Sequence, residues 1–182
     1  TGKPAHLASH VDIPRGAANF QAFNDTIKNL STESFEMRTP DGKTALSYGV
    51  RVPRGVIAVV CPWNLPLLLM TWKVGPALAC GNTVVVKPSE FTPLTVAAAI
   101  DGWKAVGAPP VLECVVGAGE TGAAVVDNVD YVQFTGSART GKAIAHAAAE
   151  RLIPCGLELG GKDAMIVLDD ASNDNTSVLI KS

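Results

Sequence analysis

The stretch Val56-Ile57-Ala58-Val59-Val60-Cys61 decides the fold. Every position is apolar and most are β-branched, which is typical of a strand in a parallel sheet that is covered on both faces. Pro53-Arg54-Gly55 stands directly before it, and residues of these types commonly turn a chain into a new element. The rest of the sequence should therefore supply neighbouring strands and the helices that cover them.

Similar apolar runs follow downstream, separated by stretches with helical periodicity. The runs are Thr83 to Val86, Leu112 to Val116, Tyr131 to Thr135 and Ala164 to Leu168, and the helical stretches are Leu67 to Ala79, Leu94 to Val106 and Arg139 to Arg151. This alternation predicts the α/β class with a doubly wound, open parallel sheet. In such sheets ligands bind outside the carboxyl ends of the strands, so candidate residues are sought there.

Composition divides the chain into three parts. Residues 1–45 are more polar, and the apolar spacing from Ala17 to Ile27 predicts one helix there before a loop at 31–34. We interpret this part as the end of a preceding helical region. Residues 46–171 hold the sheet and show no internal repeat or linker, whereas residues 172–182 are polar and turn-like and are treated as an irregular tail.

Charge, hydropathy and cysteine spacing exclude several classes of function. The 182 residues carry a net charge of −2, which leaves no basic field for nucleic acid. The longest apolar stretch, Leu65 to Met70, is too short to cross a bilayer, and no signal peptide is visible. The four cysteines, Cys61, Cys80, Cys114 and Cys155, have neither metal-site nor disulfide spacing. We expect no metal and a reducing, cytoplasmic location.

Two glycine-rich loops are candidates for phosphate binding. The loop from Gly117 to Gly122 has G-x-G-x-x-G spacing after a predicted strand, but no acid ends the next strand, so a tight turn is favoured over phosphate contact by Gly117. The loop from Gly136 to Gly141 joins a strand to a helix and offers backbone N–H groups and the Ser137 hydroxyl to an anion. Ser137 as an ordinary helix N-cap is the alternative.

The segment Lys87-Pro88-Ser89-Glu90 places a cation and a carboxylate after a strand. The lysine could reach the oxygens of a ribose, and the glutamate could accept hydrogen bonds from two adjacent hydroxyls. The alternative is an exposed ion pair in a loop, which contributes little to stability.

Three further residues could take part in catalysis, and the first two of them also have a purely structural interpretation. Asn64 is either the N-cap of the following helix or an amide donor to an oxyanion. Lys73 interrupts an apolar helix, so it either extends its amine to the edge of the core or favours a nearby thiolate. Glu158 lies between two leucines in a segment expected to be buried, where its carboxylate would have a raised pKa and suit general-base catalysis.

Four blocks together resemble the NAD(P)-dependent aldehyde dehydrogenase superfamily, and the resemblance covers roughly residues 12 to 171. In chain order they are Pro62-Trp63-Asn64-Leu65-Pro66, Lys87-Pro88-Ser89-Glu90, Phe134-Thr135-Gly136-Ser137 and Leu157-Glu158-Leu159-Gly160-Gly161-Lys162. The resemblance implies an atypical Rossmann domain over residues 46–171. It also implies that residues 1–45 lie next to an oligomerisation region and that the full-length form is a homo-oligomer.

The resemblance assigns cofactor contacts to residues of these blocks. Lys87 and Glu90 would hold the adenosine ribose, Ser137 the pyrophosphate, and Pro62 with Trp63 the nicotinamide side. A glutamate at position 90 indicates NAD and disfavours NADP, because it would repel a 2′-phosphate. The remaining expected cofactor residues are Ser89, Gly117, Gly136, Gly141, Leu159 and Gly160.

The resemblance also implies a reaction, in which a cysteine thiolate attacks an aldehyde that is then oxidised to the acid. Asn64 would donate to the oxyanion, Glu158 would activate the hydrolytic water, and Lys73 would assist proton movement. The family's cysteine follows the glutamate by about 30 to 35 residues, whereas 24 residues follow Glu158 here and none is Cys. We therefore expect an inactive fragment of an aldehyde dehydrogenase, the alternative being a nucleotide-binding module without turnover.

The substrate class rests on smaller resemblances. Residues 13–20 and 65–73 look like the 2-hydroxymuconic semialdehyde group of the superfamily, whereas residues 111–170 look closer to enzymes of the succinic semialdehyde type. An aldehyde substrate, with a semialdehyde as the particular expectation, is common to both.

Overall fold

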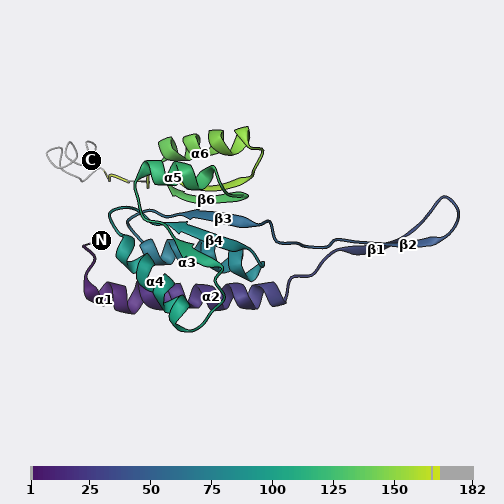
Figure 1. The fold of residues 1–182 in the computed structure, drawn as a ribbon, viewed down its shortest axis with the longest axis horizontal. Coiled ribbons are helices and arrows are strands. Elements are labelled where there is room, and N and C mark those ends of the chain that lie inside the picture. Colours follow the sequence, from purple (N-terminus) through teal and green to yellow (C-terminus); the bar gives the residue numbers. More distant parts are fainter. Residues whose placement is uncertain (1, 165, 169–182) are drawn as a thin grey trace.

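A five-stranded parallel sheet organises the computed structural model, which describes residues 2–164 and 166–168 (Figure 1). The strands lie in the order β5-β4-β3-β6-β7, and every neighbouring pair is parallel. Their bounds are β3 (Val56–Val60), β4 (Thr83–Lys87), β5 (Leu112–Cys114), β6 (Tyr131–Gly136) and β7 (Cys155–Leu159). The apolar run that begins at Val56 thus forms the central strand, β3.

Helices cover both faces of this sheet, which confirms the doubly wound α/β prediction. Helices α3 (Pro66–Ala79) and α4 (Pro93–Ala105) lie on one face, and α5 (Gly119–Val126) and α6 (Ala138–Glu150) lie on the other (Figure 1). From β3 the strand order runs outward to β4 and β5, then returns to β6 and β7 on the other side. The direction in which strands are added to the sheet therefore reverses between β3 and β6, and a ligand crevice is expected at the carboxyl ends of these two strands.

The core has one cluster on each face of the sheet. Alternate residues of β3 enter different clusters, with Val59 packed toward α3 and α4 and Ala58 packed toward α5 and α6. Both residues are fully buried. Burial on both faces explains why this strand is apolar at every position, since a strand with one wet face would alternate.

The N-terminal segment packs against α3 through α2 (Ile13–Lys28), which follows the short α1 (Ala5–Leu7) and a π-helical turn, η1 (Ala8–Asp12). Asn19 donates a hydrogen bond from Nδ2 to Thr71 Oγ1 over 2.9 Å. A Cβ atom at Gly75 would stand 2.8 Å from the Phe23 ring, so the glycine allows the two helices to approach. The helix predicted between residues 17 and 27 is confirmed and is longer than expected.

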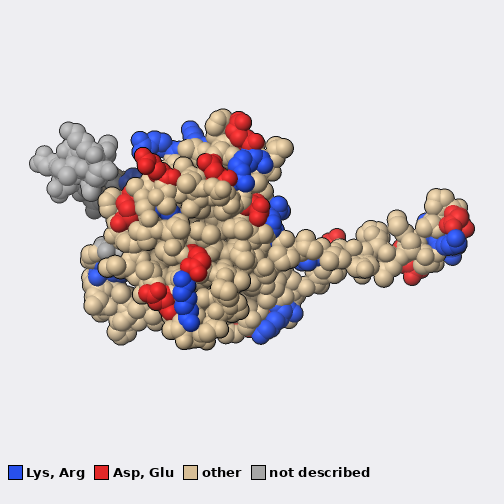
Figure 2. All heavy atoms as spheres, viewed as in Figure 1, with Lys and Arg blue, Asp and Glu red and all other residues tan. Residues whose placement is uncertain are grey.

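An antiparallel hairpin projects from the body as an arm, formed by β1 (Ser34–Arg38) and β2 (Thr44–Tyr48) (Figure 1). Strand β1 was not predicted from the sequence, and residues 46–48 were predicted to belong with the parallel sheet, whereas Leu46 pairs with Glu36 in the arm. The boundary between residues 45 and 46 thus falls inside β2. Charged side chains gather at the tip of the arm, where Lys43 pairs with Asp41 over 2.9 Å (Figure 2).

The strand predicted over residues 164–168 is wrong for the residues described there. Residue 164 and residues 166–168 belong to no strand, and Ile166 is 85% exposed. An apolar run forms a strand only where a partner strand and a covering layer are available, and the described chain provides neither at this place. The predicted tail at 172–182 lies outside the described residues.

The described residues contain neither a membrane-spanning helix nor a metal-binding cluster. No helix there is both long and apolar enough to cross a membrane. No cluster of three or more histidine, cysteine, aspartate or glutamate side chains in the same part of the chain could hold a metal ion.

Candidate functional site

The predicted site residues gather at the edge of the sheet where the five parallel strands end. Lys87, Gly136 and Leu159 are the last residues of β4, β6 and β7. The other candidates stand in the segments that follow strands, except for Glu158 inside β7 and two helical residues, Lys73 on α3 and Gly141 on α6. Parallel strands bring their carboxyl ends to one edge, so sequence-distant blocks meet there.

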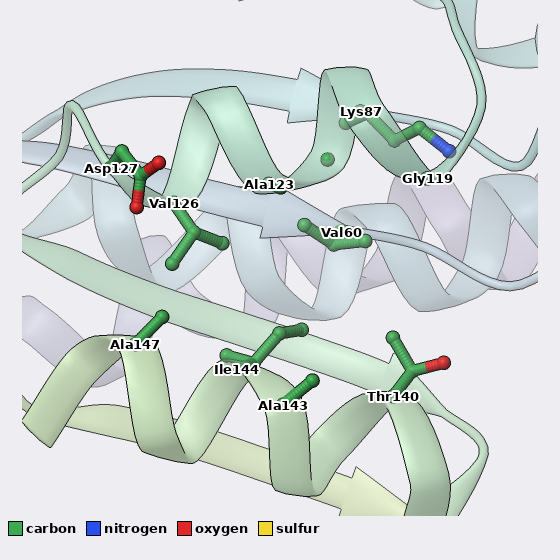
Figure 3. A pocket seen from close by; sticks show the side chains of 11 residues that line it. Val60, Lys87, Gly119, Ala123, Val126, Asp127, Thr140, Ala143, Ile144 and Ala147 are labelled. Atoms are coloured by element: carbon green, nitrogen blue, oxygen red, sulfur yellow. The ribbon is translucent and has the colours of Figure 1, made fainter.

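A cavity of ≈200 Å³ lies between α5 and α6 at this edge (Figure 3). Its walls are small and apolar, and include Val60, Ala123, Val126, Ala143, Ile144 and Ala147. Lys87 and Thr140 lie at one end and Asp127 at the other (Figure 3). Pockets that enclose a drug-sized ligand measure about 300–1,000 Å³, so this cavity can enclose one planar part of a larger ligand.

Lys87 is a buried lysine at the end of β4. The residue is 5% exposed, and its Nζ lies 3.5 Å from Glu90 Oε2. The carboxylate of Glu90 is 45% exposed, and its own backbone amide and then Lys87 hold its pKa below the ordinary value. The exposed ion pair that the sequence left as an alternative is therefore not what forms, because one partner is buried.

Ser137 is the N-cap of α6, as one of the two sequence interpretations proposed. Its Oγ accepts a hydrogen bond from Thr140 N over 3.2 Å and donates one to Thr140 Oγ1 over 3.0 Å. The first turn of α6 contains no acidic residue. This helix end thus keeps its positive dipole uncompensated beside the cavity, which favours an anion.

Three of the candidate glycines allow close packing within the chain. A side chain at Gly117 would overlap Thr121, one at Gly136 would overlap the Phe134 ring, and one at Gly141 would overlap Leu159. Gly117 is not among the glycines with a positive φ, so close packing against Thr121, and not a left-handed turn, accounts for glycine at this position. These contacts explain why glycine stands at the three positions whether or not a ligand binds.

A second cavity, of ≈470 Å³, brings Lys73 and Glu158 together. Leu69, Trp72, Gln133, Thr135 and Leu159 complete its lining. Sequence reasoning did not single out Thr135, whose Oγ1 is buried without a hydrogen-bond partner among the described residues. The available signal was the polar alternation Gln133-x-Thr135 at the end of β6, since residues two apart share a face of the sheet.

Lys73 is buried, not extended to the edge of the core. It is 7% exposed and lines both the second cavity and a third one, formed against Tyr131 and Gln133. Desolvation lowers the pKa of its amine, while Cys61 and Glu158 oppose that effect. An amine with a lowered pKa releases a proton more easily than an exposed lysine.

Glu158 is exposed in the structure, so the expectation of a buried carboxylate is wrong. Among the described residues, β7 is the outermost strand of the sheet and β6 is its only partner. The apolar neighbours Leu157 and Leu159 indicated burial, but an edge strand with one partner shields its carboxyl end poorly. The carboxylate nevertheless faces the same cavity as Lys73.

Asn64 is not the N-cap of α3. Leu65 holds that position, Pro66 opens the helix, and the Leu65 backbone N donates to Asn64 Oδ1 over 3.0 Å. The Asn64 side chain is exposed, and its Nδ2 amide has no partner within the described part of the chain. The amide thus keeps two free N–H donors beside the carboxyl end of β3. Pro62 and the 57% exposed Trp63 precede it in the same loop.

None of the four cysteines, all of which the structure describes, lines the cavity that holds Glu158. Cys61 directly follows β3, and burial raises the pKa of its thiol to about 12. Burial also raises the pKa of Cys114. Neither thiol is a thiolate at neutral pH, and the thiolate is the reactive form.

Comparison with known proteins identifies the class to which this fold and site belong. The model of the aldehyde dehydrogenase family matches residues 1–180, and the chain belongs to that family. The family expectation drawn from the four sequence blocks is thereby confirmed.

Among curated relatives, a 2-hydroxymuconic semialdehyde dehydrogenase of Pseudomonas sp. (strain CF600) is 58% identical over 179 residues, covering 96% of this chain and 37% of the relative. A 2-aminomuconic 6-semialdehyde dehydrogenase of Pseudomonas sp. is 48% identical over 175 residues, covering 93% and 36%. The NAD+ complex of an aldehyde dehydrogenase from Bacillus cereus superposes with a TM-score of 0.84 at 38% identity, covering 95% and 35%. The chain thus spans little more than a third of these proteins.

Proposed function

We propose that this chain forms the nucleotide-binding part of an enzyme that oxidises a semialdehyde to its carboxylic acid with NAD. The observation that carries the proposal is the common edge of the sheet. The first cavity, which we call the groove between α5 and α6, is suited to a nucleotide and opens there. The second cavity, which contains Lys73 and Glu158, opens at the same edge. The relatives that are semialdehyde dehydrogenases support the substrate class, with 2-hydroxymuconic semialdehyde as the particular candidate.

The groove between α5 and α6 fits the adenosine half of NAD. Its apolar, mostly small side chains can contact both faces of a planar base, while the buried Lys87 amine and Glu90 stand where the ribose would follow. The N-terminus of α6 at Ser137 would then receive the pyrophosphate. We propose that the other residues predicted from the sequence to contact NAD, among them Pro62, Trp63, Ser89 and Gly160, also line the NAD site.

Catalysis would divide among three side chains. The free Nδ2 amide of Asn64 donates to the oxygen of the aldehyde as negative charge develops on it. Glu158 removes a proton from the water that hydrolyses the acyl intermediate, and the amine of Lys73 relays that proton away from the cavity. NAD, when bound, accepts the electrons that the aldehyde loses. The thiol nucleophile would have to come from outside the four cysteines described, because none of them lines this cavity.

Two preparations test the proposal. Isothermal titration of the purified chain with NAD should show saturable binding, while aldehyde should produce no NADH because no reactive thiol faces the cavity. The second preparation is a chimaera in which this chain replaces the matching third of the 2-hydroxymuconic semialdehyde dehydrogenase from strain CF600. The chimaera should reduce NAD with that semialdehyde. A folded chimaera that binds NAD but has no turnover would remove the catalytic part of the proposal and leave the nucleotide-binding module.

Removing the charge of Lys87 should weaken NAD binding. We expect Lys87→Met to raise the dissociation constant at least about tenfold, since hydrogen bonds to charged groups are the stronger ones. Glu90→Gln should raise it about fivefold, because the exposed carboxylate is partly screened by solvent. The measurement is calorimetric titration of the chain with NAD.

A matched pair of controls is available on α4 and β5. Lys104 and Glu113 form an ion pair over 2.7 Å, both about half exposed, away from the groove. Lys104→Met and Glu113→Gln should leave the dissociation constant unchanged. Equal binding curves for wild type, Lys87→Met and Glu90→Gln would take both residues out of the site.

We also propose that the β1–β2 arm joins copies of the full-length protein. An isolated two-stranded hairpin is marginally stable in water, and this one exposes apolar side chains on both faces, with Phe35 at 56%, Leu46 at 66% and Tyr48 at 63%. A second copy could cover these side chains. In sedimentation experiments Leu46→Asp should shift the chimaera to a smaller species, whereas Asp41→Ala at the tip should not. An unchanged mass for Leu46→Asp would contradict this role.

A further inference from the structure

The groove between α5 and α6 ends in a carboxylate. Asp127 lines the cavity at the end away from Lys87, and Figure 3 shows its carboxyl group turned toward the space between the two helices. The neighbouring lining residues, Val126 and Ala147, are apolar. A ligand part that fills this cavity from the Lys87 end therefore meets one hydrogen-bonding side chain at its far edge.

Asp127 is exposed, and no contact within the described chain accounts for an acid at this position. Asp127 is the C-cap residue of α5, where the negative end of the helix dipole disfavours an anion. Within the described chain its carboxylate accepts no hydrogen bond and takes part in no ion pair. The carboxylate is therefore free to accept a hydrogen bond from a ligand that reaches this end of the cavity.

Arg151 holds the end of α5 in place. Its guanidinium donates from Nη1 to the carbonyl oxygen of Val126 over 2.7 Å in a partly buried contact. Arg151 directly follows α6, so this hydrogen bond ties the last turn of α5 to the end of the facing helix. The position of Asp127, one residue further along, is thereby set relative to the groove.

We propose that Asp127 accepts a hydrogen bond from the 6-amino group of the adenine of NAD, which makes it the residue that selects the base. This inference rests on the proposed nucleotide site. In a purine nucleotide the sugar is attached at the edge opposite to position 6. With the ribose held at Lys87, the 6-amino group points along the groove to Asp127, and a carboxylate is purely an acceptor.

The test compares two ligands that differ in this group alone. Purified chain is titrated calorimetrically with AMP and with purine riboside 5′-monophosphate, which lacks the 6-amino group. Wild type should bind AMP about fivefold more tightly, the range of a net hydrogen bond. In Asp127→Ala the ratio should fall to about one while the affinity for purine riboside monophosphate is kept, which also shows that the variant is folded.

Glu150→Ala is the matched control. It removes an exposed carboxylate at the last residue of α6 that is not part of the cavity lining, and it should keep the fivefold ratio. An unchanged ratio in Asp127→Ala, or an equal loss of both ligands, would overturn the role of Asp127 while the nucleotide site stands. Absence of NAD binding to wild type would overturn the nucleotide site, and the role of Asp127 with it.

Discussion

Glu158→Gln in the chimaera should lower kcat by about 10²- to 10⁴-fold, the contribution expected of a general base. Glutamine keeps the size and the hydrogen-bonding reach of the side chain, but it cannot take a proton from water. The step that suffers is hydrolysis of the acyl intermediate, which follows the reduction of NAD. NAD affinity should not change, because the residue lies in the second cavity and not in the groove between α5 and α6.

Rapid-mixing measurements of NADH separate this role from a structural one. The variant should still form NADH in a burst equal to the enzyme concentration, and only the steady-state rate after the burst should fall. Glu150→Gln, an acid-to-amide change at an exposed site, should behave as wild type. A steady-state rate within about twofold of wild type would show that Glu158 is not the base, since general-base catalysis contributes far more.

Asn64→Ala should lower kcat by about 10²- to 10³-fold, the loss measured when one donor to an oxyanion is removed. Its effect falls on the first chemical step, because charge develops on the aldehyde oxygen when the nucleophile adds. The burst itself should therefore become slow, in contrast to the burst of Glu158→Gln. The free Nδ2 amide beside the end of β3 is the structural basis of this expectation.

Asn29→Ala provides the control for the loss of an asparagine. Asn29 caps the end of α2, where its Nδ2 donates to the Asp25 carbonyl over 2.8 Å, and it is not among the residues of the carboxyl edge. This variant should keep the wild-type burst rate. A fast burst in Asn64→Ala would exclude Asn64 as the oxyanion donor.

The fold was predictable because its signals are local. The short run Val56 to Val60 favours a covered strand over a buried helix, because it is only five residues long and most of its side chains are β-branched. The arm was missed for the same reason. Its strands alternate weakly and are exposed on both faces, so no burial pattern marks them.

The site was predictable in its residue types but not in its burial. Lys87 and Lys73 are both lysines beside apolar runs, and sequence alone left each with an exposed alternative. The structure buries both, because β4 has a strand on either side and α3 packs on the sheet. Glu158 was expected to be buried and is exposed, since β7 has a neighbouring strand on one side.

The sequence by itself determined the α/β class, the doubly wound sheet, the order of the site blocks and the family, because each depends on neighbouring residues and their spacing. Only the tertiary structure decided which of those blocks share a cavity. Lys73 and Glu158 are 85 positions apart in the sequence. Lys87 lines a cavity together with α5 and α6, which begin more than 30 positions after it. Residues so far apart in the sequence line one cavity because of the strand order β5-β4-β3-β6-β7, which is set by long-range packing of the sheet.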